Sequence, residues 1–204
     1  MTVRRGEGWG TNGPLPADGV VVRSDAEARA VVEAARRAGE EPPALGLLGG
    51  DLCRTLGGSG DEARLHTEEA TRAVVDLGCV LVDGRQFWFL AQLVARRSWW
   101  WGPLVVAANA QWLGRWDVAP RSHPGDGKLD VVVADLSLRD RTKAWRRLPQ
   151  GSHVPHPGIT ERQLAATQLD LDPPCPVWLD GVRVATRARA LSVRVEPDAV
   201  AVVV

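Results

Sequence analysis

The chain has 204 residues, of which 45% are apolar and 25% are charged, a balance typical of a globular protein rather than of a disordered chain. Basic and acidic residues number 25 each, so no basic excess points to nucleic acid as a partner. Apolar runs are too short to cross a bilayer, no signal peptide pattern follows the first arginines, and three widely spaced cysteines suit neither a disulfide framework nor a zinc motif. We therefore expect a cytoplasmic, globular protein.

The first part of the chain predicts a fragment of an α/β layer. Residues 1–18 read as an arm or an ordered loop. Ser24 and Glu27 form a capping-box pattern, and Gly39 is a typical helix stop. The expected elements are a strand at 19–23, a helix at 26–38, a strand at 44–48 and a short helix that starts at 49–51 and ends at 57–58.

After residue 66 the pattern favours many short strands. Asp83-Gly84 and Asp180-Gly181 are hairpin-turn signals, and Ser137 can cap one basic helix over 138–148. The expected strands are 71–82, 86–95, 103–112, 129–134, 165–171, 177–179, 182–186, 190–195 and 199–204. The predicted fold class is therefore α+β: a small incomplete α/β layer in residues 1–60, then a predominantly antiparallel β-sandwich domain in residues 61–204.

Gly49, Gly50 and Asp51 open the short helix directly after a strand. Backbone N–H groups at such a helix start can receive a phosphate group, which makes these three residues candidate phosphate ligands. Two glycines can equally make a tight strand-to-helix turn and nothing more.

The most concentrated aromatic segment is Trp99, Trp100 and Trp101, which follow Arg96 and Arg97. Indole rings prefer the headgroup zone of a membrane and arginines attract anionic lipid, so these five residues are a candidate lipid interface. If the segment were a strand, Trp99 and Trp101 would share one face and Trp100 the other, and part of the set would belong to the core or to a partner surface.

Two segments could hold a metal ion. Asp126, the backbone of Lys128 and Asp130 combine carboxylate and carbonyl oxygens, the ligands that Mg²⁺ prefers; the alternative is an Asp-Gly turn that leads into a strand. His153 and His156 are spaced to converge on a metal, but no carboxylate or cysteine lies near them in sequence, so hydrogen-bonded loop histidines are the simpler interpretation.

Taken together and in order, several segments over about residues 44–204 resemble the diacylglycerol kinase family, specifically the bacterial soluble lipid kinases. Residues 45–57, LGLLGGDLCRTLG, are similar to the family's PLGTxNDFARxLG segment. Pro120 and DGKLDV at 126–131 resemble the family's stretch that ends in P-x-A-x-x-x-D-G-x-L-D-V. GSH at 151–153 is similar to its G-x-H motif, and Asp180-Gly181 to the first two residues of its Asp-Gly-Glu motif. PDA at 197–199 resembles its closing Pro-x-Ala.

This resemblance implies a small α/β nucleotide domain followed by a β-sandwich domain. It implies a reaction that moves the γ-phosphate of ATP to a lipid hydroxyl, with a structural Mg²⁺ near the Asp126 loop. It also implies that Asp180 corresponds to the carboxylate that serves as general base on the acceptor hydroxyl.

The chain departs from the family where the nucleotide would bind. The family's GGDGT motif, whose backbone cradles the nucleotide phosphates, corresponds to residues 20–27, which contain no glycine pair. Asp25 and Glu27 would meet the phosphates with like charge, and Val182 replaces the glutamate of Asp-Gly-Glu. We also expect no counterpart of the family's opening strand and helix in the residues before Val20. These departures predict that ATP is not a cofactor, while Mg²⁺ stays a candidate.

The sequence thus favours a degenerate, N-terminally truncated lipid kinase relative, a pseudoenzyme that binds a lipid, a small hydrophobic ligand or a partner. Peripheral membrane contact and homo-oligomerisation are compatible with this interpretation. The alternative is an active lipid phosphotransferase that uses Asp180 as general base and either takes its nucleotide differently or borrows the missing half from a partner chain. A third class, an interaction scaffold, would need an exposed apolar patch and no cavity.

Overall fold

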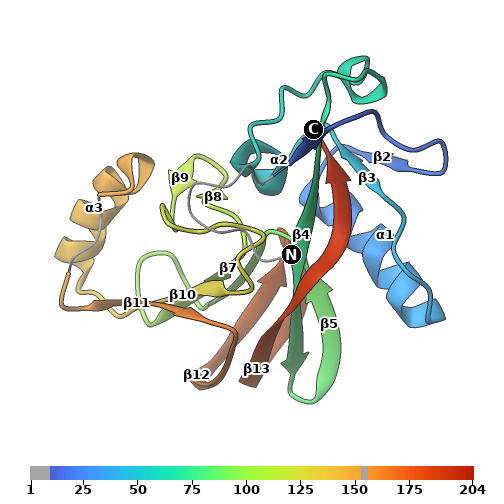
Figure 1. Ribbon diagram of the computed structural model, residues 1–204. Helices are drawn as coiled ribbons and strands as arrows, with labels where there is room; N and C mark the ends of the chain where they lie inside the picture. The colour runs from blue at the N-terminus through green and yellow to red at the C-terminus, as the bar shows by residue number, and fades with distance from the viewer. Residues whose placement is uncertain (1–9, 153–155) are drawn as a thin grey trace.

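The computed structural model describes residues 10–152 and 156–204, and an eleven-stranded sheet dominates this part of the chain (Figure 1). The strands follow one another in the sheet as β1 (Thr11–Asn12), β4 (Thr71–Val82), β13 (Val182–Val203), β12 (Ala166–Leu179), β6 (Gln92–Arg96), β7 (Leu104–Ala108), β10 (Leu129–Ala134) and β11 (Ile159–Leu164). Strand β5 (Arg85–Phe89) pairs with β4, and β2 (Val20–Val22) pairs with β3 (Leu45–Leu47). The predicted class, α+β with a β-sandwich, is confirmed.

Three α-helices and a small hairpin complete the described fold. The helices are α1 (Asp25–Ala38), α2 (Asp51–Thr55) and α3 (Leu138–Arg147), with 3-10 turns at Arg64–His66 and Leu148–Gln150. The hairpin consists of β8 (Trp112–Leu113) and β9 (Trp116–Asp117). Helices α1 and α3 lie at opposite ends of the molecule (Figure 1). None of the described helices combines the length and the apolar character that crossing a bilayer requires.

The α/β layer begins as the sequence predicts. Ser24 Oγ accepts a hydrogen bond from the Glu27 N–H at 3.2 Å, and Gly39 ends α1 with a left-handed φ of 74°. Strand β3 lies parallel to β2 on one side and, on the other, to the end of β13 at Val202 and Val203. The first 60 residues therefore extend the sheet of the rest of the chain, and the division at residue 60 stays a prediction.

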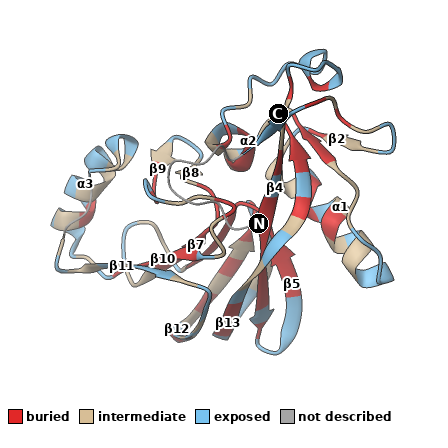
Figure 2. Cartoon of the chain, viewed as in Figure 1, coloured by how far each residue is buried: buried red, intermediate tan, exposed pale blue. Residues whose placement is uncertain are grey.

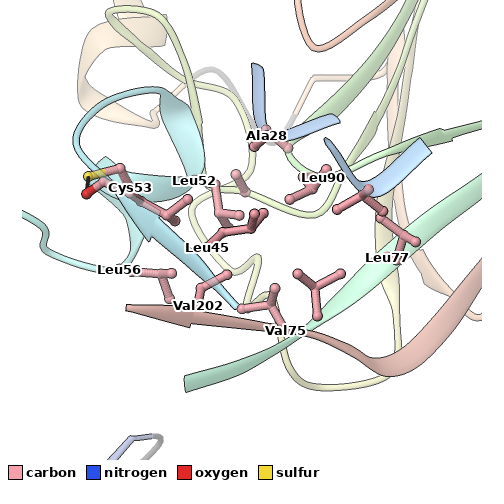
Figure 3. Packing of buried hydrophobic residues seen from close by; sticks show 14 of the residues in the cluster. Ala28, Leu45, Leu52, Cys53, Leu56, Val75, Leu77, Leu90 and Val202 are labelled. Carbon is pink, nitrogen blue, oxygen red and sulfur yellow. Dashed lines mark hydrogen bonds between the residues drawn. The ribbon is translucent and has the colours of Figure 1, made fainter. Parts of the chain in front are cut away.

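Two groups of buried apolar side chains hold these parts together (Figure 2). The first joins α1, α2 and β3 to β4 and β13, and Figure 3 shows Ala28, Leu45, Leu52, Val75, Leu77 and Val202 among its members. The second fills the space where the sheet folds over on itself, with Val80, Phe89, Leu93, Leu129, Val177 and Leu191. Burying one such side chain stabilises the fold by roughly 1.5–3 kcal/mol, so these clusters fix where α1 and α2 meet the sandwich.

The strand boundaries differ from expectation in two places. The predicted strand over 86–95 is two strands, β5 and β6, because the chain turns at Leu90 and Ala91, whose N–H groups bind the Asp180 carboxylate. The five short strands expected after residue 165 are two long ones, β12 and β13, which pass through register shifts rather than ending at them. The segment expected at 103–112 likewise divides into β7 and β8.

Both Asp-Gly hairpin turns are confirmed. Asp83 and Gly84 have φ values of 47° and 83°, and Asp180 and Gly181 have 48° and 80°. Positive φ at both central positions is the geometry of the tight turn that matches the twist of paired strands, and glycine adopts it without strain. Asp180 is therefore placed at the end of the β12–β13 hairpin by local sequence, next to the turn between β5 and β6.

Candidate functional site

A cleft of about 380 Å³ lies where the first turns of α1 and α2 face strands β6 and β12. Its lining combines acidic, aromatic and apolar side chains from segments that are far apart in the sequence. The lining residues are Ser24, Asp25, Ala26, Gly50, Asp51, Ala91, Gln92, Val94, Arg96, Trp99, Leu113, Trp178, Asp180 and Gly181. Acidic groups come from α1, α2 and the β12–β13 turn, whereas Arg96 comes from the end of β6.

The start of α2 holds the carboxylate of Asp25. The Asp51 N–H donates to Asp25 Oδ2 at 2.5 Å and the Leu52 N–H to Oδ1 at 3.2 Å. Glycine at position 50 makes this approach possible, because a Cβ there would lie 2.4 Å from Asp25 Oδ1. Burial raises the pKa of Asp25, although the two N–H donors favour its charged form.

The predicted phosphate ligands are Gly49, Gly50 and Asp51, which lie at the start of α2. The first free N–H groups of this helix donate to the Asp25 side chain of α1. A Cβ at Gly49 would lie 2.6 Å from the Arg23 carbonyl oxygen, so this glycine also serves the close approach of two backbone segments. Both interpretations of the glycine pair were left open by the sequence, and the contacts correspond to the tight-turn one. Phosphate binding here stays a prediction.

Asp51 connects α2 to the β8–β9 hairpin. Its Oδ1 accepts the Gly114 N–H at 2.8 Å, while Arg54 Nη1 donates to the Gly114 carbonyl at 2.8 Å and stacks 3.5 Å over the Trp112 ring. Burial and the nearby charge of Asp25 raise the pKa of Asp51 to about 6. The carboxyl groups of Asp25 and Asp51 therefore repel each other at the same wall of the cleft.

Asp180 is almost completely buried at the bottom of the cleft. Its Oδ2 accepts the Leu90 N–H, and its Oδ1 accepts the Ala91 and Gln92 N–H groups, all at 2.9 Å. Burial, followed by the charge of Asp25, raises the pKa of Asp180 to about 7 despite these three donors. Such a group can exchange a proton near neutral pH, but both of its oxygens already hold the turn between β5 and β6.

Arg96 faces this cleft, whereas the sequence placed it in a candidate lipid interface. Its guanidinium lies 4.1 Å from the Trp99 ring centre and 4.4 Å from that of Trp178, so the two indoles flank it. Burial lowers the pKa of Arg96, and its Nε is buried without a hydrogen-bond partner among the described residues. Gln92, at the other end of β6, also lines the cleft and is buried, with an unpartnered Oε1, while its Nε2 donates to the Trp112 carbonyl.

The three tryptophans of the candidate lipid interface, Trp99, Trp100 and Trp101, lie in the loop between β6 and β7 and not on a strand. Trp99 is half-buried, and it meets Trp116 edge-to-face at 5.2 Å. Trp100 stacks on Trp145 of α3 at 5.3 Å between ring centres. Trp100 and Trp101 remain 42% and 67% exposed, so these two rather than Trp99 are available to a surface.

Helix α3 is attached to this loop by one buried arginine. Arg141 Nη1 donates to the Trp99 carbonyl at 3.3 Å, and its Nη2 donates to the Gly102 carbonyl. Beneath the helix lies an apolar cavity of about 70 Å³. Its lining includes Val106, Trp116, Val132, Trp145, Leu148 and Ile159. Leu138 at the start of α3 is 62% exposed, and the exposed basic residues of the helix are Arg139, Lys143, Arg146 and Arg147.

The Asp126 loop carries the Mg²⁺ prediction. Asp126 Oδ1 accepts the Lys128 N–H at 2.9 Å, and Asp130 lies buried in β10 with an unpartnered Oδ1. Among the described residues no three His, Cys, Asp or Glu side chains are grouped to hold a metal ion. Carbonyl oxygens and water would have to complete the coordination, so Mg²⁺ at Asp126, Lys128 and Asp130 stays a prediction.

The alternative metal pair consists of His153 and His156. His153 lies outside the described residues, and His156 Nδ1 accepts the Gly158 N–H at 3.0 Å in the loop before β11. His156 therefore has a structural partner, as the simpler interpretation of the sequence expected.

Sequence reasoning missed three residues that shape these sites. Gln92 and Trp178 line the cleft, but neither stands in a pattern that separates it from ordinary strand residues. Asp76 is buried in β4 and accepts the Asp198 N–H at 3.0 Å and the Gly127 N–H at 2.7 Å. A carboxylate within the apolar run of 71–82 was the signal that could have revealed it.

Solved structures with the same fold support the resemblance. Two structures described as "a putative diacylglycerol kinase" and one described as "a diacylglycerol kinases", all from Bacillus anthracis str. Sterne, match with TM-scores of 0.69, 0.68 and 0.61. Their sequence identities are 14%, 15% and 14%; each match covers 91% of this chain and 77%, 77% and 75% of the other chain. At this identity the likeness concerns the fold. No curated protein matches the chain.

A sequence profile identifies the family directly. The profile described as the YegS C-terminal NAD kinase beta sandwich-like domain matches residues 79–204, which is more than half of the chain. The matched range begins within β4 and includes Asp126, Asp130 and Asp180. This chain therefore belongs to the NAD and diacylglycerol kinase family, through its YegS C-terminal β-sandwich domain.

Proposed function

We propose that this chain is a lipid kinase relative that does not transfer phosphate from ATP and that binds a lipid or a small ligand in its central cleft. The observation that supports this most is the Asp25 carboxylate on the Asp51 and Leu52 N–H groups. A bound phosphate would need the same donors, and it would meet the negative charges of Asp25 and Asp51.

The charge of the cleft supports the same proposal. Three carboxyl groups with raised pKa values, those of Asp25, Asp51 and Asp180, line it. Phosphoryl transfer depends on positive groups that neutralise the phosphate oxygens, and among the described residues that line the cleft Arg96 is the single cationic one. The residues present therefore do not fit Mg-ATP.

Calorimetry with Mg-ATP and a diacylglycerol phosphorylation assay test the proposal. The wild-type chain should show no binding at millimolar Mg-ATP and no phosphorylated lipid. Asp25→Ser frees two N–H donors and removes one charge, so it should gain weak binding of inorganic phosphate. Asp18→Ser, at an exposed position outside the cleft, is the matched control and should gain none. Micromolar binding of Mg-ATP by the wild type contradicts the proposal.

The pKa of Asp180 favours a second candidate, an active phosphotransferase in which Asp180 is the general base. A carboxyl group with a pKa of about 7 can accept a proton from a hydroxyl group at neutral pH. This candidate requires that the assay yields phosphorylated lipid, alone or with a partner chain that supplies the nucleotide site. It also requires that Asp180→Asn removes the activity while near-UV circular dichroism shows a native fold.

We also propose peripheral contact with an anionic membrane through the loop at Trp100 and Trp101 and the basic face of α3. The two exposed indoles and Leu138 supply apolar contact, and the helix supplies positive charge. Because the chain has no net charge, attraction must come from this local surface. Arg97 is exposed as the sequence expects, whereas Arg96 faces the cleft.

Flotation with anionic vesicles tests the membrane proposal. Binding should be modest, should weaken with salt, and should be lost in the double variant Trp100→Ser, Trp101→Ser. Val74→Ser and Leu81→Ser, two exposed apolar positions on β4, form the matched control and should leave binding unchanged. Absence of the wild-type protein from the vesicle fraction at low salt contradicts the proposal.

A further inference from the structure

We propose that the cleft binds an aminoalkyl phosphate, with its ammonium group between Asp25, Asp51 and Gln92 and its phosphate group on Arg96. This inference rests on the proposed function, namely that the cleft holds a ligand other than Mg-ATP. It adds the chemical class of that ligand, which follows from the distribution of charge and of unpartnered polar atoms along the cleft.

The guanidinium group of Arg96 is arranged to bind an anion. The Trp99 and Trp178 rings flank the guanidinium at 4.1 and 4.4 Å, which holds its plane in place. No ion pair or hydrogen bond joins the Arg96 guanidinium to another residue in the described part of the chain. A partly buried guanidinium with free N–H donors binds an oxyanion through two parallel hydrogen bonds, and phosphate presents the matching pair of oxygens.

The part of the cleft lined by Asp25, Asp51 and Gln92 offers two carboxylates with remaining acceptor capacity and one unpartnered amide oxygen. Asp25 and Asp51 lie close enough for the charge of the first to raise the pKa of the second. Gln92 is 2% exposed and lines the same cleft, and its Oε1 accepts no hydrogen bond from a described residue. An unpartnered buried acceptor is costly, so an N–H donor from a ligand would stabilise this arrangement.

An ammonium group suits these acceptors better than a metal ion. Among the described side chains no three carboxylates, histidines or cysteines are grouped to hold a metal. An ammonium carries three N–H donors, which can reach two carboxylates and one amide oxygen in different directions. A ligand with only a negative charge would be repelled at this end, and one with only a positive charge would be repelled by Arg96.

The same chemistry occurs in a free metabolite and in a lipid headgroup. Trp99 and Leu113 line both the cleft and the apolar cavity beneath α3, so an apolar tail could start from the cleft. The cavity holds about 70 Å³, which is small for an acyl chain. Measurement with free phosphoethanolamine and with vesicles of phosphatidylethanolamine distinguishes the two sources.

Calorimetry of the full chain with three small probes tests the inference. Phosphoethanolamine should bind at least about tenfold more tightly than ethanolamine or glycerol phosphate, because only the first satisfies both ends. Arg96→Gln should weaken phosphoethanolamine about tenfold and leave ethanolamine unchanged. Asp51→Asn should weaken phosphoethanolamine and ethanolamine but not glycerol phosphate. Arg97→Gln and Asp18→Asn, exposed positions outside the cleft, should change none of these affinities.

Arg96→Lys guards against a variant that fails to fold, because it keeps the charge and loses only the paired geometry. It should retain intermediate affinity for phosphoethanolamine. In the vesicle measurement, phosphatidylcholine is the control lipid, since its quaternary ammonium has no N–H donor. Retention on phosphatidylethanolamine alone that is lost in Arg96→Gln identifies the headgroup as the source; tight binding of the free probe alone identifies a metabolite.

Two results overturn the inference. One is equal binding of phosphoethanolamine and glycerol phosphate by the folded wild type. The other is no binding of phosphoethanolamine together with no preference for phosphatidylethanolamine vesicles. If Mg-ATP does not bind in the same samples, the proposed function survives and only the ligand class is wrong; if Mg-ATP binds, the proposed function itself is wrong.

Discussion

Helices α1 and α3 are built from the same local signals but have different surroundings. Each begins with a serine cap, Ser24 or Ser137, whose Oγ accepts an N–H three residues later at 3.2 Å. The first turn of α1 carries Asp25 and Glu27 and that of α3 carries Asp140, and each helix has two arginines in its last turn. These features stabilise a helix through its ends and its dipole, wherever the helix packs.

The difference lies in what each helix buries. Helix α1 buries Ala28 and Val32 in the core that it shares with β3 and β4. The buried residue of α3 is Arg141, and Trp145 meets Trp116 at 4.4 Å at the edge of the sheet. Core packing holds α1 in place and so positions Asp25 in the cleft, whereas the basic face of α3 is exposed.

The largest effect should come from placing a charge on the buried face of α1. Val32→Asp buries an unpaired carboxylate in the core, so the free energy of unfolding should fall by about 4 kcal/mol or more. The matched change on α3, Leu138→Asp, is at an exposed position and should stay within about 0.5 kcal/mol of the wild type. Urea unfolding followed by circular dichroism measures both. Similar losses in the two variants would mean that α3 is as much part of the core as α1.

A smaller decrease in the free energy of unfolding should follow from removing the Asp180 carboxylate at the bottom of the cleft. Asp180→Ala leaves the Leu90, Ala91 and Gln92 N–H groups without their acceptor, which should cost about 3 kcal/mol. Asp140→Ala on α3 removes an exposed carboxylate that accepts from Ser137 and Lys143, and it should cost much less. Urea unfolding compares the two. Equal costs would show that water replaces the acceptor of the β5–β6 turn.

The pH dependence of stability should come from the cleft rather than from α3. Burial raises the pKa of Asp51 to about 6 and of Asp180 to about 7, so the folded chain holds these protons more tightly than the unfolded chain, where Asp titrates near about 3.9. This stabilisation is complete below the unfolded pKa and is lost as the pH rises through the folded values. The melting temperature should therefore fall from about pH 5 to about pH 8.

Two variants that each remove one carboxylate test which groups cause the melting temperature to fall with rising pH. Asp51→Asn should make the fall of the melting temperature with pH less steep, because the contribution of Asp51 is removed while those of Asp180 and of Asp130, whose pKa is also raised to about 6 by burial, remain. Asp140→Asn should leave that fall unchanged, since hydrogen bonds from Ser137 and Lys143 lower the pKa of Asp140 and confine its effect to acid pH. Thermal melts at fixed ionic strength supply the measurement. An unchanged slope in Asp51→Asn would locate the titrating group elsewhere.

The smallest expected effect concerns the Asp126 loop, which belongs to neither helix. If Mg²⁺ binds there, Asp126→Ala should lower the melting temperature by a few degrees more in Mg²⁺ than in chelator. Asp61→Ala, an exposed carboxylate near α2, controls for general charge effects. Equal shifts in both buffers would mean that the loop is a turn held by the Lys128 N–H and nothing more.

Local signals in the sequence predicted the helices, the two Asp-Gly hairpins and the strands over 71–82 and 129–134. They could not predict that β5 and β6 are separate, since the turn between them is held by Asp180, 90 residues further along from Leu90. The family was also within reach of the sequence, because it depends on motifs whose order survives in residues 79–204.

The sites required the tertiary structure, because their contacts join residues that no local pattern relates. Asp25 and Asp51 are 26 positions apart and meet through a hydrogen bond of 2.5 Å. The sequence predicts that Arg96 belongs to a surface patch with Trp100. In the structure the rings of Trp99 and of Trp178 on β12 hold its guanidinium in the cleft. The sequence alone determined the helices, the turns and the family, since these depend on neighbouring residues and on the order of short motifs along the chain. Only the folded chain decided which charges face one another, because burial and long-range pairing set where each side chain points.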